Sequence, residues 1–154
     1  MREVNASEIT NIVKQLCIEN NINLDKDVTE KIIEFEKKED SPIGKQILEQ
    51  ILINAKLATE ENRPMCLDTG IAVIFVELGQ DVHISKDNFY DAINEGVKRG
   101  YTQGYLRKSV VEDPVFDRKN TKDNTPAIIH TDIIPGDKIK ITVASKGAGS
   151  EPRY

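Results

Sequence analysis

The 154-residue sequence predicts an α+β fold, in which a helical N-terminal layer packs on a small mixed β-sheet. Apolar residues recur at helical spacing through residues 1–60. A continuous, β-branched apolar run follows at 71–78, and two more β-rich runs lie at 127–134 and 138–144. We therefore expect a helical part at residues 1–60 and an α/β part at residues 61–154.

Three helices are predicted in the helical part. Ser7 is the N-cap expected for the first, with apolar residues at helical spacing behind it. The second extends from about Asp27 to Lys38. The third begins at Ser41, where a capping residue precedes a proline in the first turn. It ends before Pro64, because proline disfavours helical geometry in the residue before it.

The α/β part begins with the run 71–78, which predicts a strand buried on both faces because it is apolar throughout. Ser85 is expected to cap a helix whose inner face carries Phe89, Ile93, Val97, Tyr101 and Tyr105. The polar stretch 113–126 predicts a loop of a length that is often functional. The last two strands are joined by a tight-turn sequence, Pro135-Gly136-Asp137.

Composition restricts the classes of function. The net charge of -5 gives no electrostatic reason to bind nucleic acid. No apolar stretch approaches the roughly 20 residues that span a bilayer. The N-terminus lacks the apolar core of a signal peptide, and the two cysteines do not form a disulfide framework. We expect a cytoplasmic protein that has no nucleic-acid or membrane partner.

Cys66 and Asp68 are the first candidate site residues. They lie two positions apart, in a turn that ends at Gly70 and leads into the apolar run. A thiolate there can bind iron, and the carboxylate is within reach of whatever the iron binds. Most lone cysteines, however, are small buried hydrophobic residues, and this is the expected role of Cys17.

The triplet Asp68-Thr69-Gly70 also allows a second interpretation. Aspartic proteases carry this triplet, and some are chains of this size that dimerise to pair two aspartates. The helical first third of the chain argues against that fold. In a third interpretation, Asp68 is a turn residue that satisfies its own backbone.

Arg107 and the glycine-rich segment 147–150 are further candidates, each with two interpretations. Arg107 follows a predicted helix, where it can complement the helix C-terminus or bind a carboxylate with its planar fork. Gly149 lies in a loop whose backbone N–H groups can approach an anion, or in a flexible tail.

Several segments together resemble the α subunit of class I fumarate hydratases and L-tartrate dehydratases, which are iron–sulfur hydro-lyases. The resemblance covers nearly the whole chain, and the segments occur in the order of that family. They are Arg63-Pro64-Met65-Cys66-Leu67-Asp68-Thr69-Gly70, Glu95-Gly96-Val97-Lys98-Arg99-Gly100-Tyr101, Leu106-Arg107-Lys108-Ser109-Val110-Val111, Asp117-Arg118-Lys119-Asn120-Thr121 and Lys146-Gly147-Ala148-Gly149-Ser150.

The resemblance implies a site for a dicarboxylate such as fumarate. It makes Cys66 the first of three cysteines that hold a [4Fe–4S] cluster. It makes Asp68 a carboxylate that contacts substrate and transfers a proton, Arg107 a carboxylate-binding residue, and Gly149 substrate-facing backbone. Leu67 stands where the family usually has a substrate-contacting glutamine. Because leucine cannot hydrogen-bond a substrate, the sequence does not select between fumarate, tartrate and another hydroxy acid.

The resemblance also implies that further parts are needed. Family α chains supply the other two cluster cysteines after the glycine-rich segment, and a β subunit adds acid–base and substrate groups. We therefore expect residues 1–154 to be the N-terminal part of an α-type catalytic domain, oligomeric and without a stable cluster of its own. An alternative is a non-catalytic remnant of the fold that keeps an anion site.

Overall fold

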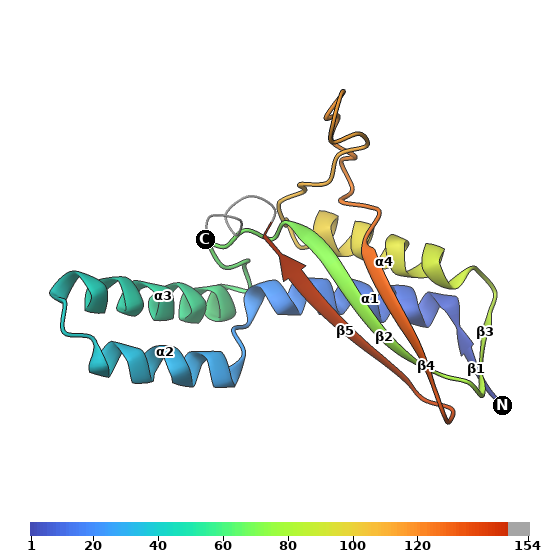
Figure 1. Cartoon of the computed structure of the whole chain (residues 1–154), viewed down its shortest axis with the longest axis horizontal. Coiled ribbons are helices and arrows are strands. Elements are labelled where there is room, and N and C mark those ends of the chain that lie inside the picture. Colours follow the sequence, from blue (N-terminus) through green and yellow to red (C-terminus); the bar gives the residue numbers. More distant parts are fainter. Residues whose placement is uncertain (148–154) are drawn as a thin grey trace. The chain divides into compact units, whose positions relative to one another are not determined.

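The computed structural model describes residues 1–147 and divides the chain into two compact units (Figure 1). The first unit comprises Met1–Asn20 and the chain from Asp68 onward, and the second comprises Asn21–Leu67. The α+β class is confirmed. No helix in the described part of the chain is long and apolar enough to cross a bilayer. Gly149 lies outside the described residues.

The first unit is built on a three-stranded sheet. Its central strand is β2 (Ile71–Gly79), which pairs in parallel with β4 (Ile128–Ile134) and antiparallel with β5 (Ile139–Lys146). All three strands were expected, but β4 and β5 do not pair with each other. A separate two-stranded parallel sheet joins β1 (Arg2–Asn5) to β3 (Val82–Ser85), and neither of these short strands was predicted.

The turn between β4 and β5 closes over the end of β2. The Gly79 N–H donates to Lys138 O at 2.8 Å, and the Asp81 N–H donates to Gly136 O at 3.0 Å. A Cβ atom at Gly79 would collide with the Gly136 carbonyl and lie 2.8 Å from the Lys138 nitrogen. Glycine at this position therefore lets one turn carry the chain from one edge of β2 to the other.

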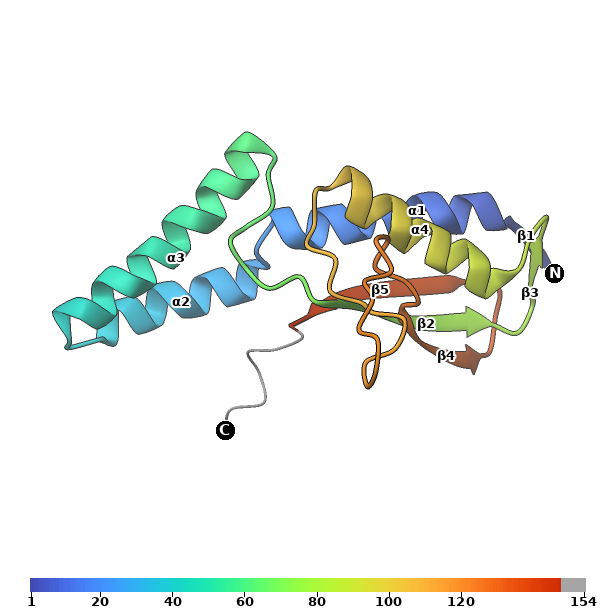
Figure 2. The same ribbon diagram turned by 90° about the horizontal axis from the view of Figure 1, so that it is seen from above.

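Two parallel helices cover one face of this sheet (Figure 2). They are α1 (Ala6–Ile22), which belongs to the first unit as far as Asn20, and α4 (Phe89–Gln103). The expectation that β2 is buried on both faces was wrong. Ala72, Ile74 and Val76 are buried under the helices, whereas Phe75 is 48% exposed on the other face and stacks on His130.

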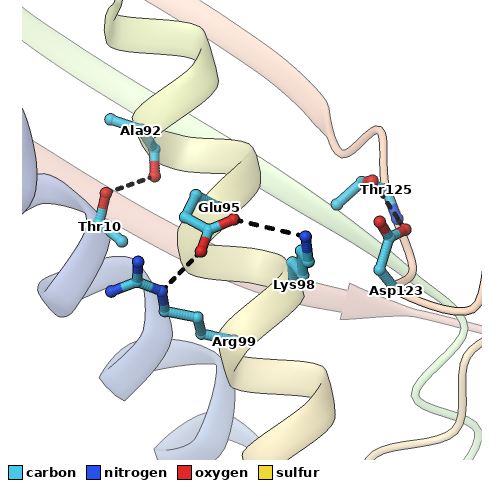
Figure 3. A network of polar contacts seen from close by, with 7 residues as sticks. All are labelled: Thr10, Ala92, Glu95, Lys98, Arg99, Asp123 and Thr125. Atoms are coloured by element: carbon cyan, nitrogen blue, oxygen red, sulfur yellow. Dashed lines mark hydrogen bonds and ion pairs between the residues drawn. The ribbon is translucent and has the colours of Figure 1, made fainter. Parts of the chain in front are cut away.

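The two helices approach closely because α4 presents glycines to α1. A Cβ atom at Gly96 would lie 2.7 Å from Val13 Cβ and 2.8 Å from Thr10 O, and one at Gly100 would lie 2.7 Å from Cys17 Cβ. The Thr10 hydroxyl donates to Ala92 O at 2.9 Å across the same interface (Figure 3). Val13, Cys17, Ile93, Val97 and Tyr101 are fully buried around it.

Both predicted N-caps of these helices were wrong. Asn5 accepts a hydrogen bond from the Ser7 N–H, and Asn88 accepts from the Tyr90 and Asp91 N–H groups. Asparagine competes equally well with serine for this position, so residue type alone did not identify the cap. Tyr105 was also misplaced, since α4 ends at Gln103 and the Tyr105 side chain is 90% exposed.

The second unit is a helical hairpin of α2 (Lys26–Lys38) and α3 (Pro42–Glu61), which confirms the predicted pair. Ser41 caps α3 by accepting a hydrogen bond from the Gly44 N–H, and Asn62 ends it in a left-handed conformation. The segment after α3 returns to the start of the unit, because the Met65 N–H donates to Asn21 O at 2.8 Å.

Replacing Gly96 with alanine should destabilise the first unit by about 1–3 kcal/mol, because the new methyl group must displace α1. Thr102→Ala, at an exposed position of the same helix, is the matched control and should change the free energy of unfolding by less than about 0.5 kcal/mol. Urea unfolding followed by circular dichroism measures both. Equal stabilities of the two variants would show that the helices do not need this close approach.

Candidate functional site

Asp68, Thr69 and Gly70 form a tight turn at the start of β2. The Gly70 N–H donates to Asp68 Oδ1 at 3.0 Å, and Gly70 has a φ of 43°, a conformation that glycine adopts without strain. Asp68 is half-buried and Thr69 is buried. Asp68 thus makes the backbone hydrogen bond of a turn residue, which fixes the orientation of its carboxylate.

Thr69 brings this turn and the Arg107 segment together. Its hydroxyl donates to Arg107 O at 3.0 Å, and its own carbonyl accepts a hydrogen bond from the Tyr101 hydroxyl at 2.8 Å. Two of the predicted site residues, Asp68 and Arg107, therefore come from parts of the chain that are in direct contact. The distance in sequence between Thr69 and Arg107 is 38 residues.

Arg107 lies beyond the end of α4. Gly104 caps that helix, and the Leu106 N–H donates to Tyr101 O while the Leu106 side chain is buried. The Arg107 side chain is exposed, and within residues 1–147 it makes no ion pair. A guanidinium in this state keeps its planar set of donors for an anion from solution.

Asn124 links the same two segments and was not predicted. It is fully buried, with Nδ2 donating to Gly70 O at 3.1 Å. Its Oδ1 accepts from the Ser109 N–H at 2.7 Å and the Val110 N–H at 3.1 Å. One side chain therefore bonds the end of the Asp68 turn and the segment after Arg107.

The loop that carries Asn124 is itself anchored next to α4. Asp123 Oδ1 accepts hydrogen bonds from the Thr125 N–H and hydroxyl, and Lys98 of α4 lies nearby (Figure 3). Partial burial opposes ionisation, but the hydrogen bonds and the Lys98 charge prevail and lower the pKa of Asp123. The Asn94 side chain accepts from the Ala127 N–H and holds the start of β4 to the same helix.

Tyr101, beside the Asp68 turn, has a raised pKa. Burial is the main cause that raises the pKa of its hydroxyl from 10.0 to about 12, and the charge of Asp68 acts in the same direction. Hydrogen bonds with Ser145 and Asn124 oppose this shift. The phenol is therefore a neutral hydrogen-bond donor at physiological pH and holds the Thr69 carbonyl.

The two cysteines have different environments. Cys66 is exposed in the second unit, where its N–H donates to Asn54 Oδ1 at 3.2 Å. Cys17 is fully buried, and burial raises the pKa of its thiol to about 12. Core packing, as expected for Cys17, is confirmed. Leu67, next to Cys66, is 42% exposed.

In residues 1–147, the Cys66 region included, no group of three or more His, Cys, Asp and Glu side chains is placed to hold a metal ion. At the end of β5, Lys146 Nζ donates to the Gly147 carbonyl at 3.0 Å. The glycine-rich segment that contains Gly149 begins here. The roles assigned to Cys66, Leu67, Asp68, Arg107 and Gly149 stay predictions.

A family model described as fumarate hydratase (fumerase) matches residues 10–153. The chain belongs to this family. A protein named "Putative L(+)-tartrate dehydratase subunit alpha" from Methanocaldococcus jannaschii is 36% identical over 150 residues, which are 94% of this chain and 52% of that protein. The L(+)-tartrate dehydratase subunit alpha of Escherichia coli K12 is 29% identical over 147 residues, which are 93% of this chain and 48% of that protein.

Family membership confirms the resemblance seen in the sequence and does not favour the aspartic protease interpretation of Asp68-Thr69-Gly70. The chain spans about half the length of the curated relatives that it matches. The match runs across both units, so the fumarate hydratase family accounts for the helical hairpin as well as for the sheet.

Thiol labelling should separate the two cysteines. In the native protein, Ellman's reagent should modify one thiol rapidly, because Cys66 is exposed and Cys17 is sealed in the core with a raised pKa. Cys66→Ser should abolish this rapid reaction, and Cys17→Ser should leave it unchanged. Rapid modification of Cys17 in the folded protein would contradict the described core.

The stability of the first unit should fall as the pH rises from about 9 to 12. The folded pKa values of Cys17 and Tyr101 are both raised to about 12, so their contribution is complete below the unfolded pKa and is lost as the folded pKa is approached. Tyr101→Phe should make this pH dependence shallower, whereas Tyr105→Phe, at an exposed position, should not. Urea unfolding at a series of pH values provides the test.

Proposed function

We propose that this chain forms the α-type part of an iron–sulfur hydro-lyase, which adds water to fumarate or removes it from a hydroxy-dicarboxylate such as L-tartrate. The observation that carries the proposal is the contact between the Asp68 turn and the Arg107 segment through Thr69, in a chain of the fumarate hydratase family. The names of the two relatives, which are tartrate dehydratase α subunits, support the reaction class.

The roles of the residues follow from their chemistry. Arg107 pairs its exposed guanidinium with one carboxylate of the substrate. Removal of water breaks a C–O bond at one carbon and a C–H bond at its neighbour, so a base must take the proton. Asp68 exchanges this proton, and its oriented carboxylate suits general acid–base catalysis. We also propose that Gly149, which lies outside the described residues, offers backbone N–H groups to the substrate.

A [4Fe–4S] cluster does not fit this chain by itself. The sequence contains two cysteines, and Cys17 is buried in the core. Only Cys66 offers an accessible thiolate, whereas a cluster needs three or four. We therefore propose that Cys66 supplies one ligand and that further polypeptide supplies the rest. A β-type subunit is the proposed partner, in a cytoplasmic oligomer.

A test of this function combines the full chain with the complementary half of the Methanocaldococcus jannaschii relative, a β subunit, iron and sulfide under anaerobic conditions. Hydration of fumarate and dehydration of L-tartrate should appear only in the combined sample. Asp68→Asn should lower kcat by about a hundredfold or more, because a general acid–base residue is lost. Arg107→Lys should mainly raise KM.

Asp132→Asn is the matched control, since Asp132 is an exposed aspartate of β4 that belongs to none of the family segments. Its activity should equal that of the unmodified chain. Two results would contradict the proposal. One is robust fumarate hydration by this chain alone with stoichiometric iron and sulfide. The other is full activity of the Asp68→Asn variant in the combined sample.

A further inference from the structure

Asn124 forms hydrogen bonds with main-chain groups of two segments that do not pair with each other in a sheet. Its amide donates to the Gly70 carbonyl and accepts from the Ser109 and Val110 N–H groups. Gly70 is 54 residues away in sequence, and Ser109 is 15 residues away. Because the side chain is 0% exposed, water cannot replace these bonds when the amide is removed.

The segment after α4 is held on both sides of the Arg107 side chain. Thr69 fixes the Arg107 carbonyl, and Asn124 fixes the N–H groups of Ser109 and Val110. Between them, the Asn120 side chain donates to Lys108 O at 2.9 Å. The backbone that carries Arg107 is therefore tied to the backbone that carries Asp68 by Thr69 at one end and by Asn124 at the other.

Asparagine suits position 124 for two separate reasons. Its φ of 64° is left-handed, a conformation that asparagine adopts more readily than most residues that have a Cβ atom. Its amide carries both a donor and an acceptor, and both are used. Aspartate keeps the shape and the acceptor but has no donor for Gly70 O, whereas glycine keeps the backbone conformation and loses both groups.

We propose that Asn124 is a positioning residue that fixes Asp68 and Arg107 relative to each other for the binding of a dicarboxylate. This inference rests on the proposed function, because it assumes that the two side chains share one substrate. Asn124 acts through the backbone of both segments. Its removal should therefore weaken ligand binding more than it weakens the fold.

The test measures the affinity of the full chain for L-tartrate by calorimetry. Asn124→Gly and Asn124→Asp should each lower the affinity by about tenfold or more, because a small misplacement of two charged groups is costly. Val76→Ala is the matched control. It should destabilise the same unit by leaving a cavity in the core toward the other end of β2 from Gly70, and should leave the affinity within about twofold of the unmodified chain.

The outcomes separate the inference from the function. If the unmodified chain binds L-tartrate and both Asn124 variants bind it equally well, the inference is wrong and the proposed function stands. An equal loss of affinity in Val76→Ala would also overturn the inference, since the effect would then follow stability. If the unmodified chain shows no saturable binding, the inference is wrong, because the two segments then do not hold a dicarboxylate by themselves, whereas the proposed function is decided by the activity of the combined sample.

Amide hydrogen-exchange rates of the unmodified chain provide a second test, which needs no variant. The Ser109 and Val110 amides share one acceptor, so both should be protected and should exchange at a similar rate. Saturation with L-tartrate should slow both further, while the Ile74 amide in β2 should not change. Unprotected Ser109 and Val110 amides would show that Asn124 does not hold this segment, and would overturn the inference.

Discussion

The close approach of α1 and α4 is the constraint on which the first unit depends. Gly96 and Gly100 leave no room for a Cβ atom between the helices, so Val13 and Cys17 lie directly against the α4 backbone. Tyr101 follows Gly100 and is fully buried, and its hydroxyl reaches the carbonyl of Thr69. The helix interface thereby fixes the position of α4 against α1. Through the Tyr101 hydroxyl, α4 in turn holds the backbone of the turn that carries Asp68.

Much of this fold could be predicted because it follows from local patterns. The helices α2 and α3 and the strands β2, β4 and β5 have clear periodicity or β-branched runs, and they were found. The pair β1 and β3 could not be found, since four residues are too few to show a period. The exposed face of β2 was missed because an apolar run does not reveal whether helices cover one side of a sheet or both.

The candidate site was predicted only in part, for a similar reason. Cys66, Asp68 and Arg107 belong to motifs of the family, and the contact between Thr69 and Arg107 agrees with a shared site for the last two. Asn124 has no such signal, because its role lies in hydrogen bonds to backbone groups 14 to 54 residues away. Its place in a polar, turn-rich loop gave the one available hint, that a loop of this length is often functional.

The most direct test of this account is a map of the L-tartrate binding surface on the isotopically labelled chain by nuclear magnetic resonance. Backbone amides of residues 68–70 and 106–110 should shift together with a single dissociation constant, since one ligand contacts both segments. Shifts confined to other surfaces, or separate dissociation constants for the two segments, would contradict it.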